Sequence, residues 1–266
     1  MSNRNGLNIL EKFFSYDIIM SMRKVKLTIE YMGTHFCGYQ IQPDGRSVQG
    51  ELERVLREVF KEDIKTFASG RTDAGVHALG QVVHFETSKN WKPERIRASL
   101  NLYLPPDISV ISAEDVDDNF DARFNSHYKT YGLRFYLSRY TLPHLVGRSN
   151  RVNDNVDVDL MGEACKYFIG THDFKSFVAR KSGKTDFVRT IYTAKIHKIN
   201  EEEYEFEVSG NGFLYNMVRI MFGTLLMVGS HRIKPDDVKK IIDQKMRNCA
   251  GKTEKPEGLY LKSVKY

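Results

Sequence analysis

Short segments that alternate apolar and polar residues recur along this chain, and amphipathic helical segments separate them. Every second residue from Val25 to Tyr31 is apolar, so these side chains line one face of an expected strand. Ser47 precedes an apolar stripe at helical spacing over residues 48–59 and is the expected N-cap of a helix. The same patterns predict further strands at residues 64–68, 82–85, 108–113, 128–136, 188–199, 204–208 and 259–264, and helices at residues 92–102, 160–168, 213–228 and 235–245. Strands interleaved with helices in this way indicate an α+β fold.

Three glutamates alternate along the strand expected at residues 204–208. Glu203, Glu205 and Glu207 occupy every second position, opposite the apolar face. Because isolated carboxylates are rarely buried, we expect all three side chains to point to water.

The elements divide into two α+β halves of similar make-up that meet near residues 115–130. We expect an N-terminal subdomain at residues 22–125 and a C-terminal subdomain at residues 126–266, with sheets that join and a cleft between them. Residues 1–21 lack a core-forming pattern and are expected to form a flexible extension outside the fold. The functional site is expected in the cleft, because ligand sites gather at such boundaries.

The composition favours an acidic partner and a cytoplasmic location. The chain has 266 residues, and 40 Lys and Arg against 34 Asp and Glu give a net charge of +6, which suits nucleic acid. The cysteines Cys37, Cys165 and Cys249 form no CxxC pair, which argues against a disulfide framework and a thiolate zinc site. The most apolar run, residues 213–228, is short for a membrane span and contains Arg219, so no membrane partner is expected.

The segment ASGRTDAGVHALGQVVHFET, residues 68–87, places a single aspartate in a glycine-rich turn. Asp73 follows Arg71 by two residues, and the glycines at positions 70, 75 and 80 are incompatible with a stable helix. On the residues alone, the commoner role of such an aspartate is in a turn or a cap.

Two other groupings suggest ligand sites, and both are the less favoured interpretation. His77, His84 and Glu86 invite a metal site, but one of the three ligands would have to come from a loop. The segment SGNGF, residues 209–213, resembles a strand–glycine–helix phosphate cradle but lacks the full GxGxxG pattern and the ribose-binding acid of a dinucleotide site. Binding of an RNA phosphate at the start of the following helix remains an alternative for this segment.

Basic and aromatic side chains interleave in two runs, residues 121–136 and 178–190. The first contains Arg123, Lys129 and Arg134 among Phe124, Tyr128 and Tyr131, and the second contains Arg180, Lys181, Lys184 and Arg189. Either run alone would more often be the solvated face of a strand or a charged loop. Two such runs in a basic chain favour RNA, since these residue types pair with phosphates and stack on bases.

The ordered motifs resemble those of the TruA family of tRNA pseudouridine synthases, from about Lys24 to the C-terminus. The sequence GRTDAGVHA followed by GQVVHF is close to a family signature. Supporting matches are Y-x-G-x-x-x-x-G-x-Q at residues 31–40, RSVQGELE at 46–53, NLYLPPDI at 101–108, DARF at 121–124, DFKSF at 173–177, NGFLYNMVR at 211–219 and EGLYL at 257–261.

The resemblance implies roles for individual residues. Asp73 would be the catalytic nucleophile, and Arg71 would hold the extruded nucleotide or fill the place it left. Tyr131 would stack on the target base, and Arg219 would pair with the aspartate from the facing half. The expected RNA-binding residues are Arg123, Lys129, Arg180, Lys181 and Lys184.

The resemblance also implies the architecture and the substrate. The fold would consist of two ferredoxin-like (RRM-like) α/β halves that share a mainly antiparallel sheet, with the active-site cleft between them. The protein would act as a cytoplasmic homodimer on the anticodon arm of tRNA, at positions 38, 39 and 40.

The expected reaction is the isomerisation of uridine to pseudouridine, which involves no net redox change and no hydrolysis, so neither a cofactor nor a metal is expected. The aspartate could attack C1′ of the ribose, attack C6 of the base or remove the 2′ proton, and the sequence leaves all three open. Two alternatives remain: a catalytically silent RNA-binding protein, and a metal-dependent hydrolase built on His77, His84 and Glu86.

Overall fold

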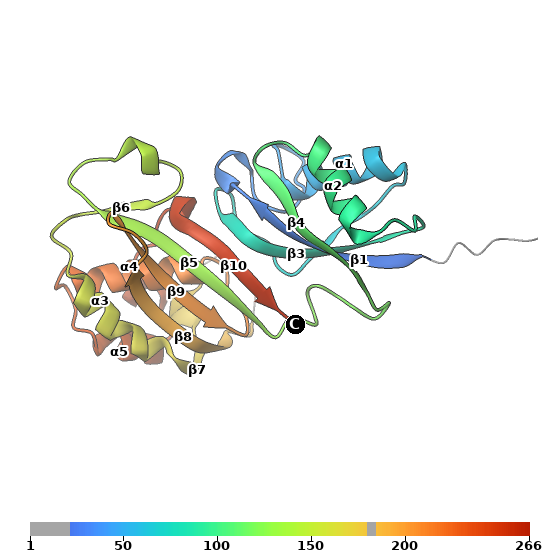
Figure 1. Cartoon of the computed structure of the whole chain (residues 1–266). Helices are drawn as coiled ribbons and strands as arrows, with labels where there is room; N and C mark the ends of the chain where they lie inside the picture. Colours follow the sequence, from blue (N-terminus) through green and yellow to red (C-terminus); the bar gives the residue numbers. More distant parts are fainter. Residues whose placement is uncertain (1–21, 180–184) are drawn as a thin grey trace, which may run out of the picture.

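The computed structural model describes residues 22–179 and 185–266. The extension expected at residues 1–21 lies outside the described residues, as do Arg180, Lys181 and Lys184. The described chain forms one large, mostly antiparallel sheet with helices packed on it (Figure 1).

The sheet runs through the whole molecule. Its strands follow one another in the order β4-β1-β3-β10-β5-β9-β8-β7, with β2 beside β3 and β6 beside β5. The strands are β1 (Arg23–Tyr31), β2 (Phe67–Ala68), β3 (His77–Thr87), β4 (Ile108–Val116), β5 (Tyr128–Leu137), β6 (Asn150–Val152), β7 (Gly170–Asp173), β8 (Val188–Lys198), β9 (Glu203–Gly210) and β10 (Leu259–Lys265). Neighbours are antiparallel except for the pairs β10 with β3 and β5 with β6.

The helices fall into two groups along the sheet. They are α1 (Val48–Phe60), α2 (Pro93–Tyr103), α3 (Val158–Cys165), α4 (Met217–Gly229) and α5 (Asp237–Gln244). The first two pack together, and α2 contacts β4, whereas α3 contacts α4 and β8 (Figure 1). Each end of the sheet therefore has its own helical layer.

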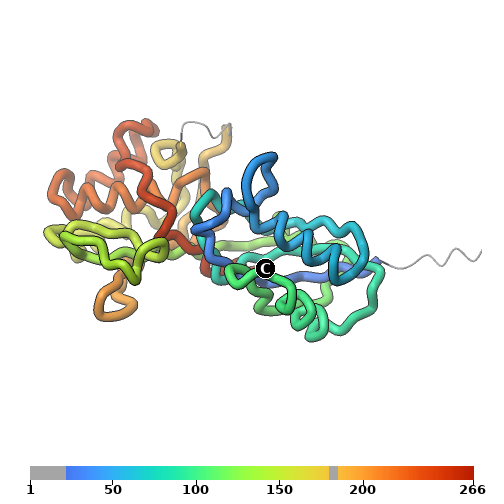
Figure 2. Tube along the Cα trace, turned by 90° about the horizontal axis from the view of Figure 1, so that it is seen from above, coloured from blue at the N-terminus to red at the C-terminus, as the bar shows by residue number. Residues whose placement is uncertain are grey.

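The hydrophobic core is divided in the same way. One cluster includes Val25, Leu52 and Phe85 from the N-terminal part, and the other includes Phe135 and Phe222 from the C-terminal part. The last strand, β10, contributes to both clusters and lies between β3 and β5, so we call these three strands the seam. Seen from above, the C-terminus lies at the middle of the molecule, between the two ends of the sheet (Figure 2).

Several predicted elements are confirmed. The side chains of Val25, Leu27, Ile29 and Tyr31 are buried along β1, as their alternation predicts. The Ser47 hydroxyl accepts a hydrogen bond of 3.2 Å from the backbone N–H of Gly50 and caps α1. Helix α2, Pro93–Tyr103, matches the helix predicted at residues 92–102 to within one residue at each end.

The prediction for the three glutamates of β9 is wrong. Only 1% of Glu205 is exposed, Glu203 is also buried and Glu207 is half-buried. Cationic side chains from β5, β8 and β10 cover this face of β9 and pair with the carboxylates of Glu205 and Glu207. The alternation along one strand could not reveal those partners.

Other predicted boundaries are also displaced. The helix expected from residue 213 begins at Met217, after Asn216 in the left-handed region with φ of 61°. The strand expected at residues 82–85 begins earlier, at His77, so that half of the glycine-rich motif lies within β3. The short strands β6 and β7 are not predicted by the alternation patterns.

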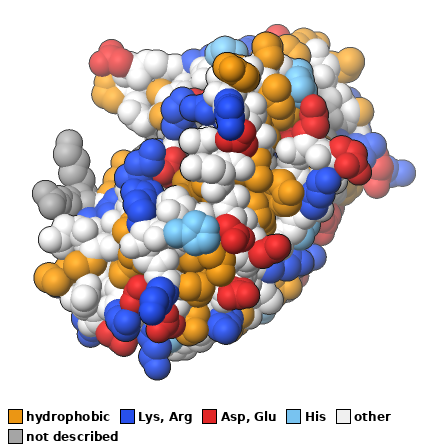
Figure 3. Space-filling model, turned by 90° about the vertical axis from the view of Figure 1, so that its left-hand side faces the viewer, with side chains coloured by type: hydrophobic (Ala, Val, Ile, Leu, Met, Phe, Trp, Pro, Cys, Tyr) orange, Lys and Arg blue, Asp and Glu red, His pale blue; other side chains and the backbone are white. Residues whose placement is uncertain are grey.

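The face at the left-hand side of Figure 1 carries basic and acidic side chains interspersed with hydrophobic ones (Figure 3). The net positive charge is therefore not gathered into a single patch on this face. Within residues 22–179 and 185–266, every helix is too short or too polar to cross a lipid bilayer.

Candidate active site

A cleft with a volume of about 1360 Å³ is lined by residues from both halves of the chain. We call it the central cleft. Its lining includes Phe67, Arg71, Asp73, Phe124, Tyr131 and Asn216. The structure thus places Asp73 and Tyr131, two of the sequence-predicted site residues, in one cavity beside the seam.

The loop that carries Asp73 is anchored on both sides. The Tyr31 hydroxyl and the Thr72 hydroxyl are 2.7 Å apart, and the Tyr39 N–H donates to the Thr72 carbonyl over 3.0 Å. The Gln81 amide donates to the Gly70 carbonyl over 2.7 Å. These contacts from β1, the following loop and β3 fix the backbone on which the aspartate is mounted.

Gly75 completes the turn beyond Asp73. The Val76 N–H donates to the Asp73 carbonyl over 3.1 Å, and Gly75 between them has a φ of 76°. A Cβ atom at this position would lie 2.9 Å from the Pro256 side chain, so a residue other than glycine would be both strained and crowded. The turn predicted from the glycines is confirmed.

The Asp73 carboxylate itself is held in an unfavourable environment. It is half-buried, and among the described residues no hydrogen bond and no ion pair within 4.0 Å involves it. Burial raises the pKa of Asp73 above its ordinary value, and the positive charge of Arg219 only partly opposes that rise. A carboxylate that is desolvated and incompletely paired is a strong base and nucleophile for its type.

Arg219 lies in the first turn of α4 and faces the aspartate from the C-terminal half. Its Nε donates to the Glu254 carbonyl over 2.5 Å, and its Nη1 donates to the Asn216 side-chain oxygen over 2.7 Å. Burial lowers the pKa of Arg219, and the charge of Asp73 acts in the opposite direction. The two charges therefore interact, although within the described chain they do not form an ion pair closer than 4.0 Å.

Tyr131 lies in β5, where it packs against both core clusters. Its ring meets Phe213 edge to face, with the ring centroids 5.1 Å apart. Burial raises the pKa of the Tyr131 hydroxyl, and the nearby Tyr31 and Asp73 add to the rise. The residue is thus a neutral phenol whose ring is fixed at the wall of the cleft.

The structure describes Arg71, which is predicted to hold the nucleotide, and two of the five predicted RNA-binding residues, Arg123 and Lys129. Arg71 and Arg123 are exposed, and both line the central cleft together with Lys129. The Lys129 ammonium also donates a hydrogen bond to the Ser69 carbonyl, next to the loop of Asp73. Arg180, Lys181 and Lys184 lie outside the described residues.

The metal site considered for His77, His84 and Glu86 is not assembled. His77 accepts a hydrogen bond from the Gly33 N–H at Nδ1, and its Nε2 contacts the Glu257 carbonyl, both over 2.9 Å, so neither ring nitrogen is available. His84 accepts from the Ala122 N–H at Nδ1. These histidines hold loops to the sheet.

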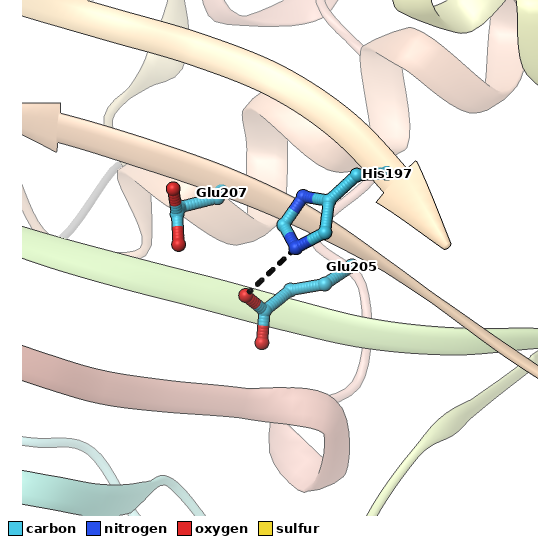
Figure 4. Close-up of side chains that lie close together, drawn as sticks. All are labelled: His197, Glu205 and Glu207. Carbon is cyan, nitrogen blue, oxygen red and sulfur yellow. Dashed lines mark ion pairs between the residues drawn. The ribbon is translucent and has the colours of Figure 1, made fainter. Parts of the chain in front are cut away.

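A different group in the described residues has metal-ligand geometry, namely His197, Glu205 and Glu207 on β8 and β9 (Figure 4). The Lys262 ammonium contacts both carboxylates, at 2.5 Å from Glu207. Arg134 lies 3.6 Å from Glu205. Since an ammonium already contacts both carboxylates, the arrangement is that of a salt-bridge network.

The segment SGNGF has a structural role at the end of β9. The Asn211 side-chain oxygen accepts a hydrogen bond of 3.0 Å from the Thr190 N–H. Because α4 begins only at Met217, residues 209–213 do not form the start of a helix, and the phosphate-cradle interpretation lacks its helix.

Three residues of the site were not predicted from the sequence. Thr72 and Tyr39 hold the backbone beside Asp73, and Asn216 orients Arg219. An asparagine before an apolar helical run is a known signal for a helix start, and it could have identified Asn216. The partners of Thr72 depend on contacts between distant segments and have no local signal.

Comparison with known proteins agrees with these motifs. The family model described as tRNA pseudouridine synthase matches residues 27–125 and 164–266. The tRNA pseudouridine synthase A of Bacillus pumilus is 47% identical over 91% of this chain and 99% of that protein. The protein of the same name from Anoxybacillus flavithermus is 47% identical over 92% and 99%, and that from an Exiguobacterium strain is 43% identical over 92% and 98%.

Among solved structures, the crystal structure of the archaeal box H/ACA sRNP Nop10-Cbf5 complex matches with a TM-score of 0.34 and 12% identity, over 87% of this chain and 61% of that chain. A TM-score this low does not establish a shared fold. The family model and the relatives cover the same motifs that surround the central cleft, and this chain belongs to the tRNA pseudouridine synthase family.

Proposed function

We propose that this protein isomerises uridine to pseudouridine in the anticodon arm of tRNA, at positions 38, 39 and 40, with Asp73 as the catalytic carboxylate. The observation that carries the proposal is the desolvated, incompletely paired Asp73 at the wall of a cleft large enough for a nucleotide. Membership of the family and the names of the relatives supply the reaction and the substrate class.

The reaction breaks the bond between C1′ and N1, turns the base and joins C1′ to C5. The proton on C5 leaves and N1 gains one, so that the product is an isomer of the substrate and no external reductant is consumed. Asp73 would attack C1′, attack C6 or remove the 2′ proton, and all three require the ionised carboxylate. Arg219 favours that form because its charge opposes the rise in the pKa of Asp73.

Tyr131 and Arg71 complete the proposed substrate contacts. The neutral phenol of Tyr131 offers a fixed flat ring to a base that has left its stack. Arg71 is exposed at the cleft, beside Asp73 in the same loop, and is suited to hold the extruded nucleotide or the place it left.

The architecture is proposed in the finer terms that the family resemblance implies. Residues 22–125 and 126–266 would be two ferredoxin-like subdomains, a division supported by the two core clusters. The working unit would be a homodimer in the cytoplasm that grips the tRNA.

The basic segment of residues 180–184 is assigned to the RNA backbone on sequence grounds. Replacing both Lys181 and Lys184 with alanine should weaken tRNA binding and flatten the plot of log affinity against log salt concentration by roughly 1 to 2 units of slope. Affinity measured between low and moderate salt checks this. An unchanged slope would show that this segment does not contact the RNA backbone.

The function is tested by tritium release from tRNA labelled at C5 of uridine, followed by mapping of the modified positions. The wild type should release tritium and place pseudouridine at positions 38 to 40, whereas Asp73→Asn should do so at least roughly a thousandfold more slowly. A wild type that binds tRNA without releasing tritium would instead support the silent RNA-binding alternative.

A further inference from the structure

Two phenylalanine side chains that line the central cleft are exposed. Phe124 is 80% exposed and Phe67 is 55% exposed, and both line the cleft that contains Asp73. A phenylalanine gains roughly 1.5 to 3 kcal/mol when it is buried, so two rings left in solvent at a functional cavity call for a ligand that covers them.

The turn that carries Phe124 is anchored by hydrogen bonds. The Asp121 carboxylate accepts hydrogen bonds from the backbone N–H groups of Arg123 and Phe124, over 2.7 and 2.9 Å. Ala122, which follows Asp121, is fully buried, and its carbonyl accepts a hydrogen bond of 2.6 Å from the Tyr266 hydroxyl. The exposure of the Phe124 ring is thus imposed by an anchored backbone and does not result from a frayed loop.

Phe67 is tied to the same point of the structure. It lies in β2 and stacks on the imidazole of His84, with centroids 5.1 Å apart and an angle of 20° between the rings. The Nδ1 atom of that imidazole accepts a hydrogen bond of 3.1 Å from the Ala122 N–H. One histidine therefore supports the ring of Phe67 and anchors the turn that presents Phe124.

Basic groups accompany the two rings. The guanidinium of Arg123 lies 5.5 Å from the centroid of the Phe124 ring, and Arg71 and Lys129 line the same cleft. Exposed aromatic rings among guanidinium and ammonium groups suit an unpaired nucleotide, whose base stacks while its phosphate meets the charges.

We propose that Phe67 and Phe124 form a second stacking subsite, which holds an unpaired base of the RNA substrate other than the base acted on. The subsite is separate from Tyr131, whose ring is half-buried in the wall of the cleft against Phe213. The inference rests on the proposed function in one respect, namely that the substrate is RNA with unpaired nucleotides near the target.

The test measures the affinity of the full-length protein for an anticodon stem-loop RNA after Phe124→Ala and after Phe67→Ala. Each change should weaken binding by roughly 5- to 100-fold, as expected for the loss of one stacked base, and should raise KM with little effect on the single-turnover rate at saturating RNA. Phe124→Tyr should bind within about twofold of the wild type, because it keeps the flat ring. Leu102→Ala is the matched control, since Leu102 is also 80% exposed but lies in α2, outside the cleft.

A cycle with abasic RNA identifies the stacked base. RNAs that each lack one base of the anticodon loop are bound to the wild type and to Phe124→Ala. For the RNA that lacks the stacked base, the two proteins should bind with equal affinity. Unchanged affinity in both alanine variants, or an equal loss in Phe124→Tyr, would overturn the proposal. A shift in oligomeric state with unaltered RNA affinity would assign the rings to a protein interface and would overturn it as well.

The results distinguish a failure of the stacking subsite from a failure of the proposed function. Tritium release by the wild type together with unaltered affinities would retain the function and reject the subsite. Loss of RNA affinity in the alanine variants of a protein that releases no tritium would retain the subsite and reject the function.

Discussion

Asp73 and Glu205 are both withdrawn from water in the same protein, yet their surroundings are opposite. Glu205 is only 1% exposed, and Lys262, Arg134 and His197 all approach its carboxylate. Asp73 is half-buried beside one cation, Arg219, and among the described residues no hydrogen bond or ion pair within 4.0 Å involves its carboxylate. The first arrangement compensates desolvation and holds strands together, whereas the second leaves a charge available for reaction.

The pKa of Glu207, which also pairs with Lys262, shifts in the opposite direction to that of Asp73. At Glu207, burial opposes ionisation, but hydrogen bonds from Lys262 and Lys195 outweigh it, and the pKa falls below its ordinary value. At Asp73, burial dominates and the pKa rises. We conclude that completeness of pairing, more than depth of burial, separates structural acids from the candidate catalytic acid in this fold.

The largest expected effect on stability comes from breaking the complete network. Lys262→Met removes the ammonium that contacts both glutamates and should lower the free energy of unfolding by about 3 kcal/mol, because two carboxylates lose their main partner. The pseudouridine-forming rate per folded molecule should be retained. Lys198→Met, which breaks an exposed pair with Glu201, is the control and should cost less than about 1 kcal/mol. Equal losses in the two variants would contradict the structural role of the network.

The next largest effect is expected from removing Arg219, the cation that faces Asp73. Arg219→Ala should slow single turnover by roughly a hundredfold, since a preorganised charge at the reacting carboxylate is lost. It should also shift the acid limb of the pH–rate profile to higher pH, because Arg219 lowers the pKa of Asp73. Arg139→Ala, at an exposed arginine paired with Asp154, should change neither quantity. A full rate with an unshifted profile would show that Arg219 does not act on Asp73.

A smaller effect is expected from the residue that orients this arginine. Asn216→Gly keeps the left-handed backbone conformation at φ of 61° but removes the oxygen that accepts from Arg219. The rate should fall by roughly tenfold, the scale of one charge-assisted hydrogen bond, with a smaller shift of the same acid limb. His231→Gly provides the control, because His231 also has a positive φ and lies beyond the far end of α4. If both glycine variants slow the reaction equally, the backbone and not the side chain of Asn216 is responsible.

The contrast also explains which predictions from the sequence succeeded. The strand from Val25 and the helix after Ser47 are encoded by local alternation and capping, which the sequence displays directly. The glutamates of β9 were wrongly expected to point to water, because the cations that cover them come from β5, β8 and β10. Burial of a polar face is a property of the assembled sheet, and alternation along one strand cannot report it.

The candidate site divides along the same line. Asp73, Arg71 and Tyr131 were identified by resemblance to a family, and the structure brings all three to one cleft. Asn216 was not identified, because the run from residue 213 was expected to be helical throughout, whereas its left-handed backbone delays the start of α4. The support of Phe67 and Phe124 by His84 depends on contacts between β2, β3 and a distant turn, which no local pattern encodes.

We infer that Asp73 is kept for chemistry at a cost to the stability of the fold. The free energy of unfolding of Asp73→Asn, measured as a function of pH, tests this inference. Because the folded-state pKa is raised, ionisation of Asp73 destabilises the wild type as pH rises from the unfolded-state pKa of about 3.9 through the folded-state value. Asparagine stays neutral, so the variant should be more stable than the wild type at neutral pH and lose that advantage below about pH 4, while single turnover falls at least roughly a thousandfold. A variant that is less stable than the wild type at neutral pH and still forms pseudouridine at a near-native rate would exclude Asp73 from catalysis and identify it as a turn residue.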